Sequence, residues 1–378
     1  MKYFIIAGEA SGDLHGSNLV KELKALDPKA DIQGWGGDKM QAAGVEVQKH
    51  IRELAFMGFV EVLMNIGKIL KNFNLCKKQI LHFHPDVIIC VDYPGFNLRM
   101  AKWGKIKGFK IAYYISPTVW AWKENRVETV RQYVDRMICI LPFEKDFYAT
   151  KNVTVDYVGH PTVDVIEYEK SVASSIEGNK LIALLPGSRK QEIDKMLPIM
   201  LEATKTLTEC RLVIAQAPNL DRDVYQPYLK DHRIELVQHK TYDILKVAKA
   251  AIVTSGTATL ETALFGVPQV VCYIANGLSY AIAKRLVKVD YISLVNLILH
   301  RESVLELIQH DMTVENVKTE LEKLLYDATR KDQLRNDYAE LSDILRQGGA
   351  SKKTAVIIHN LLLEDRSKNH EQDRKQEH

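Results

Sequence analysis

Residues 250–274 read AAIVTSGTATLETALFGVPQVVCYI, and this stretch decides the fold class. The apolar run 250–253 predicts a strand that ends at the turn 254–257, whose Ser, Gly and Thr residues favour the start of a helix. Gly266 ends that helix, and the apolar run 269–274 predicts a second strand. A strand–helix–strand unit of this kind is the building block of a parallel sheet.

The same turn is a candidate ligand site. Ser255, Gly256 and Thr257 leave backbone N–H groups and the positive end of a helix dipole facing outward, which suits a diphosphate. Glu261 follows one helical turn after Thr257, so we expect it to face the same site and to accept hydrogen bonds from a ribose. Turns of this composition are also common in α/β proteins that bind nothing there, so the pattern alone leaves both interpretations open.

Size and composition narrow the functional class. The chain has 378 residues, enough for two ordinary domains, with 46% hydrophobic and 26% charged residues as in globular proteins. A formal net charge of +3 is too small to indicate a nucleic-acid partner. The five cysteines include no CxxC pair, which argues against structural zinc and a disulfide framework. We find no signal sequence and no apolar run near the ~18 residues of a membrane span, so we expect a cytoplasmic protein with at most peripheral membrane contact.

The amino-terminal segment repeats the strand–turn–helix pattern. Residues 3–7 predict a buried strand, and GEASGD (8–13) leads into a helix. The glycine spacing does not match G-x-G-x-x-G, so a nicotinamide dinucleotide site is not supported. Glu9 and Asp13 are candidate substrate ligands at the strand's carboxyl end, or else turn formers and a helix cap. We expect the glycine-rich stretch 34–38 to be a simple turn.

A second carboxylate follows another strand. Residues 85–92 (PDVIICVD) predict a buried strand that ends at Asp92, and such a position points into the ligand crevice of a parallel sheet. Asp92 could equally cap the next helix, but the irregular turn at 93–97 favours a catalytic role. Further along, Trp120 and Trp122 predict either a wall for a bulky substrate or core packing. His160 is read as a sugar or phosphate contact or as a structural residue.

The segment 54–73 is apolar around more of its circumference than a surface helix should be. One interpretation is a buried helix or helix pair. The other is an element that lies at a membrane surface, with apolar side chains in lipid and lysines on anionic headgroups. The predicted membrane contacts are Phe56, Met57, Phe59, Val60, Met64, Ile66 and Lys68.

The second half begins after a polar, acidic segment at 163–180, which reads as a linker. Residues 181–185 predict a strand that runs into PGSRKQE (186–192), where Arg189 is well placed to pair with phosphate. The D-x-D spacing at 221–223 is interpreted as a solvated turn and not as a metal site. The mixed-charge segment 364–378 is expected to be disordered.

Taken together, these motifs resemble those of the lipid-A-disaccharide synthase family. The resemblance spans residue 3 to about residue 363, with the motifs in family order. They are GEASGD (8–13), LAFMGFVEVL (54–63), PDVIICVDYPGFN (85–97), SPTVWAWKENRV (116–127), LPFEK (141–145), VGHP (158–161), LLPGSRKQE (184–192), SGTATLE (255–261) and AKRLVKVDYISLVNLIL (283–299).

The resemblance implies an α/β fold of two Rossmann-like domains with parallel sheets facing across a cleft, the GT-B architecture. Residues 1–165 would be the acceptor and membrane-facing domain and 176–345 the UDP-donor domain, while the helix at 350–363 would cross back or be exchanged. The implied reaction is inverting and needs no metal or other cofactor. It joins UDP-2,3-diacylglucosamine to 2,3-diacylglucosamine 1-phosphate, giving the β-1,6 disaccharide 1-phosphate and UDP at the inner face of the inner membrane. A homodimer with exchanged C-terminal segments is also implied.

Roles for single residues carry over by motif position. Asp92 would be the general base that acts on the acceptor's 6-hydroxyl. Glu9 matches a family position that is important for activity. The positions implied to bind substrate or UDP are Ser11, Asp13, Asn97, Ser188, Arg189, Ser255, Gly256, Thr257, Glu261 and Asn296.

Three other classes remain as alternatives. Another GT-B enzyme acting on a UDP-sugar, such as an N-acetylglucosaminyl transferase or an epimerase, would give no reason for the apolar segment 54–73. A non-enzymatic lipid-binding protein would not need two nucleotide-type turns. A nicotinamide oxidoreductase is disfavoured by the missing glycine fingerprint.

Overall fold

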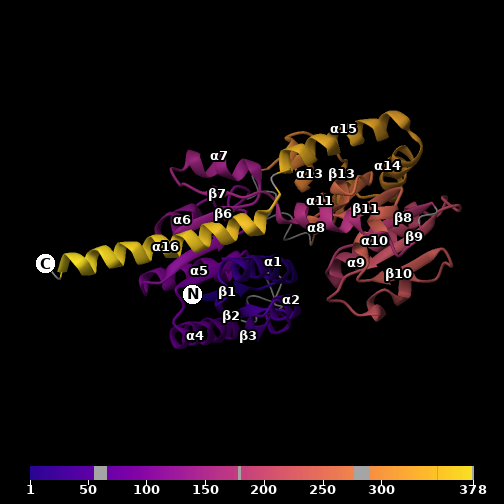
Figure 1. Cartoon of the computed structure of the whole chain (residues 1–378). Coiled ribbons are helices and arrows are strands. Elements are labelled where there is room, and N and C mark those ends of the chain that lie inside the picture. Colours follow the sequence, from indigo (N-terminus) through magenta and orange to yellow (C-terminus); the bar gives the residue numbers. More distant parts are fainter. Residues whose placement is uncertain (55–65, 178–179, 276–288, 347, 377–378) are drawn as a thin grey trace. The chain divides into compact units, whose positions relative to one another are not determined.

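The computed structural model describes residues 1–54, 66–177, 180–275, 289–346 and 348–376, with side chains described except at residue 66 and beyond residue 364. The described chain divides into two compact units (Figure 1). The N-terminal domain consists of Met1–Pro161 together with 347–378, and the C-terminal domain is Thr162–Arg346. Each is built on one parallel sheet flanked by helices, so the predicted class of two Rossmann-like α/β domains is confirmed.

The N-terminal domain contains a seven-stranded sheet in the order β3-β2-β1-β4-β5-β6-β7, and every described strand pair is parallel. The central strands are continuous buried apolar runs, as expected for a sheet covered on both faces. The strands are β1 (Lys2–Ala7), β2 (Asp31–Gly36), β3 (Glu46–His50), β4 (Val87–Val91), β5 (Lys110–Tyr114), β6 (Arg136–Cys139) and β7 (Asp156–Tyr157).

Helices complete this domain, and the last one comes from the far end of the chain. They are α1 (Ala10–Leu26), α2 (Asp38–Ala42), α4 (Ile66–Phe83), α5 (Pro94–Ile106), α6 (Arg126–Tyr133), α7 (Pro142–Thr150), α16 (Ala350–Gln376) and the 3-10 turn η1 (Ile51–Glu53). Helix α16, yellow in Figure 1, packs against α1, with buried Ala355, Ile358 and Leu362 in its first half. The C-terminal segment of this chain therefore belongs to the core of the N-terminal domain.

The C-terminal domain has a six-stranded parallel sheet in the order β10-β9-β8-β11-β12-β13. Its strands are β8 (Leu181–Leu185), β9 (Arg211–Gln216), β10 (Ile234–Gln238), β11 (Ala250–Thr254), β12 (Gln269–Tyr273) and β13 (Glu306–Ile308). Its helices are α8 (Pro161–Ser171), α9 (Lys190–Ala203), α10 (Thr241–Val247), α11 (Thr257–Leu264), α13 (Leu294–Leu299), α14 (Val314–Tyr326) and α15 (Ala328–Leu345), with 3-10 turns η2 (Arg222–Val224), η3 (Gln226–Tyr228) and η4 (Gln309–Asp311).

The strand order changes direction at one point in each sheet. In the N-terminal domain this point lies between β1 and β4, and in the C-terminal domain between β8 and β11. Open parallel sheets bind their ligands at the carboxyl ends of the strands that flank such a switch point. The residues that follow these four strands are therefore the first place to look for a site.

Three local expectations differ from the structure. The stretch 34–38 is not a simple turn, because Gly34 to Gly36 lie within β2. The expected linker 163–180 contains most of α8, whose apolar positions pack inside the domain. Helix α16 continues to Gln376 through the segment 364–378 that was expected to be disordered, and its Glu, Lys, Arg and Gln residues are good helix formers despite low hydrophobicity.

The membrane-contact residues predicted from the sequence fall largely beyond what is described. Phe56, Met57, Phe59, Val60 and Met64 lie outside the described residues, as does the side chain of Ile66. Lys68 lies exposed in the first turn of α4. Among the helices of the described ranges, none is both long enough and apolar enough to cross a membrane.

Candidate active site

The turn after β4 holds Asp92 in an unusual backbone conformation. Asp92 and Tyr93 have φ values of 47° and 49°, in the left-handed region that non-glycine residues rarely adopt. The carbonyl oxygen of Asp92 accepts hydrogen bonds from Tyr113 Oη (2.7 Å) and Asn97 Nδ2 (2.8 Å). Its backbone N–H donates to the carbonyl of Tyr114 at 3.0 Å. Two neighbouring elements, β5 and α5, thus fix a strained turn, as is common at functional sites.

The Asp92 carboxyl group is poised near neutrality. The side chain is half-buried, and burial raises its pKa to about 7, with the negative charge of Glu9 acting in the same direction. A hydrogen bond from the Tyr93 backbone N–H opposes the shift only in part. A carboxylate with a pKa close to the working pH is suited to general-base catalysis.

Glu9 stands at the end of β1, the strand next to β4, where it is the N-cap residue of α1. The turn that contains Gly8 and Glu9 comes close to the Asp92 turn, because a Cβ atom on Gly8 would lie 2.4 Å from ring atoms of Tyr93. Gly8 is therefore required for the two turns to approach each other. The structure thus brings Glu9 and Asp92 together at the switch point, and their roles toward a substrate stay predictions.

Two other predicted ligands in this domain are buried. The Asp13 carboxylate accepts backbone hydrogen bonds from Gly37 (2.7 Å), Lys39 (3.1 Å) and Met40 (3.0 Å), so it caps α2, as the alternative interpretation proposed. Asn97 is fully buried, and its Nδ2 donates to the carbonyls of Ile6, Val91 and Asp92. The Asp13 carboxylate and Asn97 Nδ2 are thus engaged inside the protein, whereas Asn97 Oδ1 is buried with no hydrogen-bond partner among the described residues, and direct substrate contact by either residue stays a prediction.

Ser11 and His160 complete the predicted set in this domain. Ser11 is exposed in the first turn of α1, beside Glu9 in the chain, and remains a candidate ligand. His160 is buried, and burial lowers its pKa to about 3, with His15 acting in the same direction. A neutral, buried imidazole fits the structural interpretation of His160 better than phosphate binding.

The two tryptophans after β5 have different environments. Trp120 Nε1 donates to the buried Glu144 at 3.3 Å, and its ring meets Phe143 edge-on at 4.9 Å, so it packs inward. The Trp122 side chain is 38% exposed. Core packing therefore accounts for Trp120, whereas Trp122 keeps a face open to solvent.

In the C-terminal domain, the turn after β8 presents Arg189. Gly187 has a φ of 102°, which allows the sharp turn that precedes α9. Arg189 is the N-cap residue of α9, and its side chain is 57% exposed while Nη1 lies 3.4 Å from Glu192 Oε1. Asn219 Nδ2 holds the Ser188 carbonyl at 3.0 Å. The predicted phosphate-binding guanidinium thus lies at a helix N-terminus and reaches solvent.

The turn after β11 lies beside it across the switch point. Gly256 has a φ of 155° and serves as the N-cap residue of α11. Gly256 and Thr257 are exposed, and the first-turn N–H groups of a helix have no intrahelical acceptor. Ser255 is half-buried, with Oγ donating to the Ile292 carbonyl (3.1 Å) and its N–H to the Cys272 carbonyl (3.0 Å). Ser255 therefore anchors the turn, and Gly256 and Thr257 present its amides.

Tyr242 positions Glu261, a role that the sequence did not indicate. Tyr242 Oη on α10 donates to Glu261 Oε1 at 2.8 Å, and the Tyr242 ring packs against Phe265 with centroids 5.5 Å apart. Glu261 is half-buried on α11, and its contact with a ribose stays a prediction. The pairing of these two residues depends on the contact between α10 and α11, which no local pattern reveals.

Asn296 lies inside the C-terminal domain. It is fully buried, and its Oδ1 accepts from the backbone N–H groups of Ser303 (2.8 Å) and Val304 (3.0 Å). Its Nδ2 donates to Glu306 Oε1 at 2.8 Å, and Glu306 in turn accepts from the Ile292 and Ser293 N–H groups. Asn296 therefore holds in place the loop on which Ser255 rests, and its predicted part in substrate binding stays a prediction.

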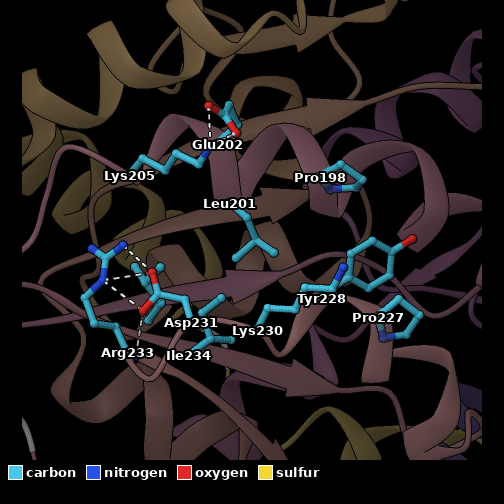
Figure 2. Close-up of a pocket in the computed structure, with 11 residues that line it drawn as sticks. Pro198, Leu201, Glu202, Lys205, Pro227, Tyr228, Lys230, Asp231, Arg233 and Ile234 are labelled. Atoms are coloured by element: carbon cyan, nitrogen blue, oxygen red, sulfur yellow. Dashed lines mark hydrogen bonds and ion pairs between the residues drawn. The ribbon is translucent and has the colours of Figure 1, made fainter.

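A pocket with a volume of about 240 Å³ lies where β9 and β10 of the C-terminal sheet begin, and Figure 2 shows its lining residues. It is lined by Leu201 and Lys205 near the end of α9 and by Arg233 and Ile234 where β10 begins. Its most prominent charges neutralise each other, because Arg233 Nη2 lies 2.5 Å from Asp231 Oδ2. Since ligands of parallel sheets bind at the carboxyl ends of strands, we do not assign this pocket to the reaction.

Within the described ranges, no group of three His, Cys, Asp or Glu residues is placed to hold a metal ion. Asp221 to Asp223, the D-x-D segment, lie around η2. All five cysteines are buried and free.

Comparison with known proteins gives independent evidence on the family of this chain. A family model described as lipid-A-disaccharide synthetase matches residues 3–360. The lipid-A-disaccharide synthase of Geobacter metallireducens is 39% identical over 373 residues, which cover 96% of this chain and 97% of that protein. The enzyme of the same name from Coxiella burnetii is 36% identical over 369 residues, covering 95% and 98%.

Solved structures with a similar fold are more distant in sequence. The UDP-GlcNAc 2-epimerase of Neisseria meningitidis, bound to UDP-GlcNAc, gives a TM-score of 0.64 at 12% identity, covering 96% of this chain and all of that one. CalG4, the calicheamicin glycosyltransferase, gives 0.60 at 16% identity, with 95% and 98% covered. At these identities the likeness shows the fold alone, which is GT-B.

Proposed function

This chain belongs to the lipid-A-disaccharide synthase family of glycosyltransferases, which acts in lipid A biosynthesis, and from that premise we propose its substrates and mechanism. The donor is UDP-2,3-diacylglucosamine and the acceptor is 2,3-diacylglucosamine 1-phosphate. Direct displacement at the donor's anomeric carbon inverts its configuration and gives the β-1,6 disaccharide 1-phosphate and UDP. The observation that supports this most strongly is the Asp92 carboxyl group, whose pKa is raised to about 7 at the switch point of the N-terminal sheet.

Asp92 is the general base. Its carboxylate takes the proton of the acceptor's 6-hydroxyl as that oxygen attacks the donor. Glu9 contacts the acceptor nearby, and its negative charge helps to keep the Asp92 pKa close to neutral. Ser11, exposed on the first turn of α1, adds a hydroxyl at the same edge of the sheet. The N-terminal domain thus carries the acceptor side of the reaction.

The C-terminal domain holds the departing UDP. Arg189, together with the Ser188 turn, binds the diphosphate with its exposed guanidinium. Gly256 and Thr257 add backbone N–H groups at the start of α11, where the helix dipole is positive. Glu261, oriented by Tyr242, accepts hydrogen bonds from the ribose. Fixed donors of this kind stabilise the negative charge that develops on the leaving group.

Helix α4 supplies a surface for the membrane. Its buried face carries Phe73, Cys76 and Ile80, while Leu70 and Leu81 are 55% and 51% exposed on the other side. Exposed lysines, including Lys71 and Lys78, accompany these leucines. Apolar and basic residues on one exposed face suit peripheral contact with an anionic bilayer, here the inner face of the inner membrane. Acylated substrates would be taken from that surface.

We also propose that two copies form a dimer by exchanging C-terminal segments. Helix α16 packs on α1 of its own chain after a break at Gly348-Gly349, and Gly349 has a φ of 79°. A hinge of this kind would allow α16 to occupy the same place on a partner. The molecular mass of the full chain in solution tests this proposal. A mass of two chains supports it, and a mass of one chain contradicts it.

One assay tests the proposed reaction. The purified protein is incubated with both acylated substrates, and the mass of the disaccharide 1-phosphate is measured together with released UDP. Parallel reactions contain UDP-N-acetylglucosamine in place of the acylated donor. Disaccharide formed from the acylated donor alone supports the proposal. Transfer or epimerisation of the unacylated sugar at an equal rate would refute it in favour of another UDP-sugar enzyme.

A further inference from the structure

The loop after β5 carries two cations on one aromatic ring. Lys123 Nζ lies 4.2 Å from the centroid of the Trp122 ring, and Arg126 Cζ lies 5.7 Å from the same centroid. The backbone N–H of Arg126 donates to the Lys123 carbonyl at 2.9 Å, closing the turn that precedes α6. Lys123 has a φ of 56°, so this turn adopts a conformation that costs free energy.

A third cation comes from α5. Arg99 lies with Cζ 5.8 Å from the ring centroid of Phe73, and its charge acts on Arg126. Burial lowers the Arg126 pKa, and Arg99 acts in the same direction. Burial also lowers the pKa of Lys123, with Arg126 adding to the shift. Arg99, Lys123 and Arg126, hereafter the cation cluster, therefore repel one another in the free protein.

The acidic side chains of this region neutralise other residues. Glu124 pairs with Lys151, and Glu128 pairs with Arg131. Across the described part of the chain, no carboxylate forms an ion pair with any member of the cation cluster. By contrast, Lys105, farther along α5, pairs with Asp135. Among the described residues, the positive charge of the cluster is thus paired with no carboxylate, and an anion would balance it.

The cation cluster lies at the same edge of the sheet as Asp92. Arg126 is close enough to Tyr113 for its charge to act on the phenol, and Tyr113 Oη donates to the Asp92 carbonyl. The loop that bears Lys123 and Arg126 follows β5, the strand paired with β4. An anion held here would therefore lie beside the proposed general base.

We propose that Arg99, Lys123 and Arg126 form the site that recognises the phosphomonoester of the acceptor, with Trp122 forming a wall against its sugar ring. This inference rests on the proposed function, which supplies an acceptor with a phosphate on the sugar. A guanidinium pairs with phosphate oxygens through charge-assisted, often bidentate hydrogen bonds. Binding the phosphate at one end of the sugar orients the hydroxyl at the other end toward Asp92.

The test compares two acceptors in neutral detergent micelles, 2,3-diacylglucosamine 1-phosphate and the same lipid without its phosphate. The ratio of their kcat/KM values measures phosphate recognition. Arg126→Gln and Lys123→Gln should each lower this ratio about 10- to 100-fold, as expected for losing a charged hydrogen bond. Lys107→Gln, which removes one exposed charge from the end of α5, should leave it unchanged. Arg126→Lys should recover part of the ratio.

Two further measurements distinguish the acceptor phosphate from the phosphates of the UDP-linked donor and of membrane lipids. The KM for the UDP-linked donor should not change in Arg126→Gln, and neither should binding to vesicles that contain anionic lipid. An unchanged acceptor ratio in both Arg126→Gln and Lys123→Gln overturns the inference, as does a loss confined to donor KM or to vesicle binding. If the wild-type protein forms no disaccharide with either acceptor, the proposed function itself fails. Melting temperatures of all variants establish that each one is folded.

Discussion

The side-chain amide of Asn97 donates a 2.8 Å hydrogen bond to the carbonyl oxygen of Asp92, the residue whose carboxyl group we assign to catalysis. The same amide nitrogen reaches the carbonyls of Ile6 and Val91 at 3.1 and 3.2 Å. One buried side chain therefore links β1, β4 and the strained Asp92 turn. We expect the position of the proposed general base to depend on this link.

Replacing Asn97 by alanine should affect both stability and rate. The substitution removes one donor from three buried carbonyl oxygens, of which that of Asp92 keeps Tyr113 Oη, and this loss should lower the free energy of unfolding by about 2 kcal/mol. Relaxation of the Asp92 turn should also lower kcat more than it raises KM. Urea denaturation and steady-state kinetics check the two effects. Asn74→Ala, on the exposed face of α4, is the matched control. An Asn97→Ala protein with unaltered kcat would contradict the positioning role.

The pH profile should report the Asp92 carboxyl group. Because its pKa is raised to about 7, the protonated and inactive form dominates below that pH, so kcat/KM should fall about tenfold per pH unit on the acid side. Glu9→Gln removes a like charge, which lowers the Asp92 pKa and should move the acid limb to lower pH. Glu128→Gln, at an exposed site of the same domain, should not move it. An acid limb that stays in place in Glu9→Gln would show that the two carboxyl groups are not coupled.

Tyr242→Phe tests the ribose contact. Loss of the 2.8 Å hydrogen bond to Glu261 frees that carboxylate to rotate. Because one hydrogen bond contributes about 1 kcal/mol, we expect the variant to bind UDP roughly fivefold more weakly. Isothermal titration with UDP measures this directly. The control is Tyr168→Phe, since Tyr168 is an exposed tyrosine on α8 of the same domain. Equal UDP affinity in the two variants would remove Tyr242 from the site.

The exposed leucines of α4 should matter for membrane binding and not for chemistry. Leu70→Ser with Leu81→Ser should reduce flotation with anionic vesicles, because the two most exposed leucines of α4 are lost while the lysines remain. Activity toward substrates in detergent should be retained. Tyr326→Ser, which removes an exposed apolar group on α14, serves as the control. Wild-type protein that fails to float at low salt would end the membrane proposal.

Continuous apolar runs made the central strands predictable from sequence. The runs at 87–91 and 250–254 are wholly buried strands, and the polar residues that follow them lie at the two switch points, as expected. Strand β2 was missed because glycines interrupt its pattern. A Cβ on Gly34 would lie 2.0 Å from the Ile5 carbonyl oxygen, so glycine is needed there for close strand approach and not for a turn.

Roles that depend on distant contacts could not be predicted. Asn97, Asn296 and Asp13 have the residue types of ligands, but all three are buried and bonded to backbone groups, and a sequence does not reveal burial of a single polar side chain. Conversely, Tyr242 and Arg126 gain their importance from neighbours on other elements. Chain order alone gives no sign of those pairings.

The central claim is that Asp92 removes the proton from the acceptor hydroxyl in a UDP-dependent glycosyl transfer. Its most direct test is turnover of Asp92→Ala with both acylated substrates, alongside titration of the same variant with UDP. The account predicts a loss of about 10²–10⁴-fold in kcat with UDP affinity unchanged. Turnover close to that of the wild-type protein would contradict it.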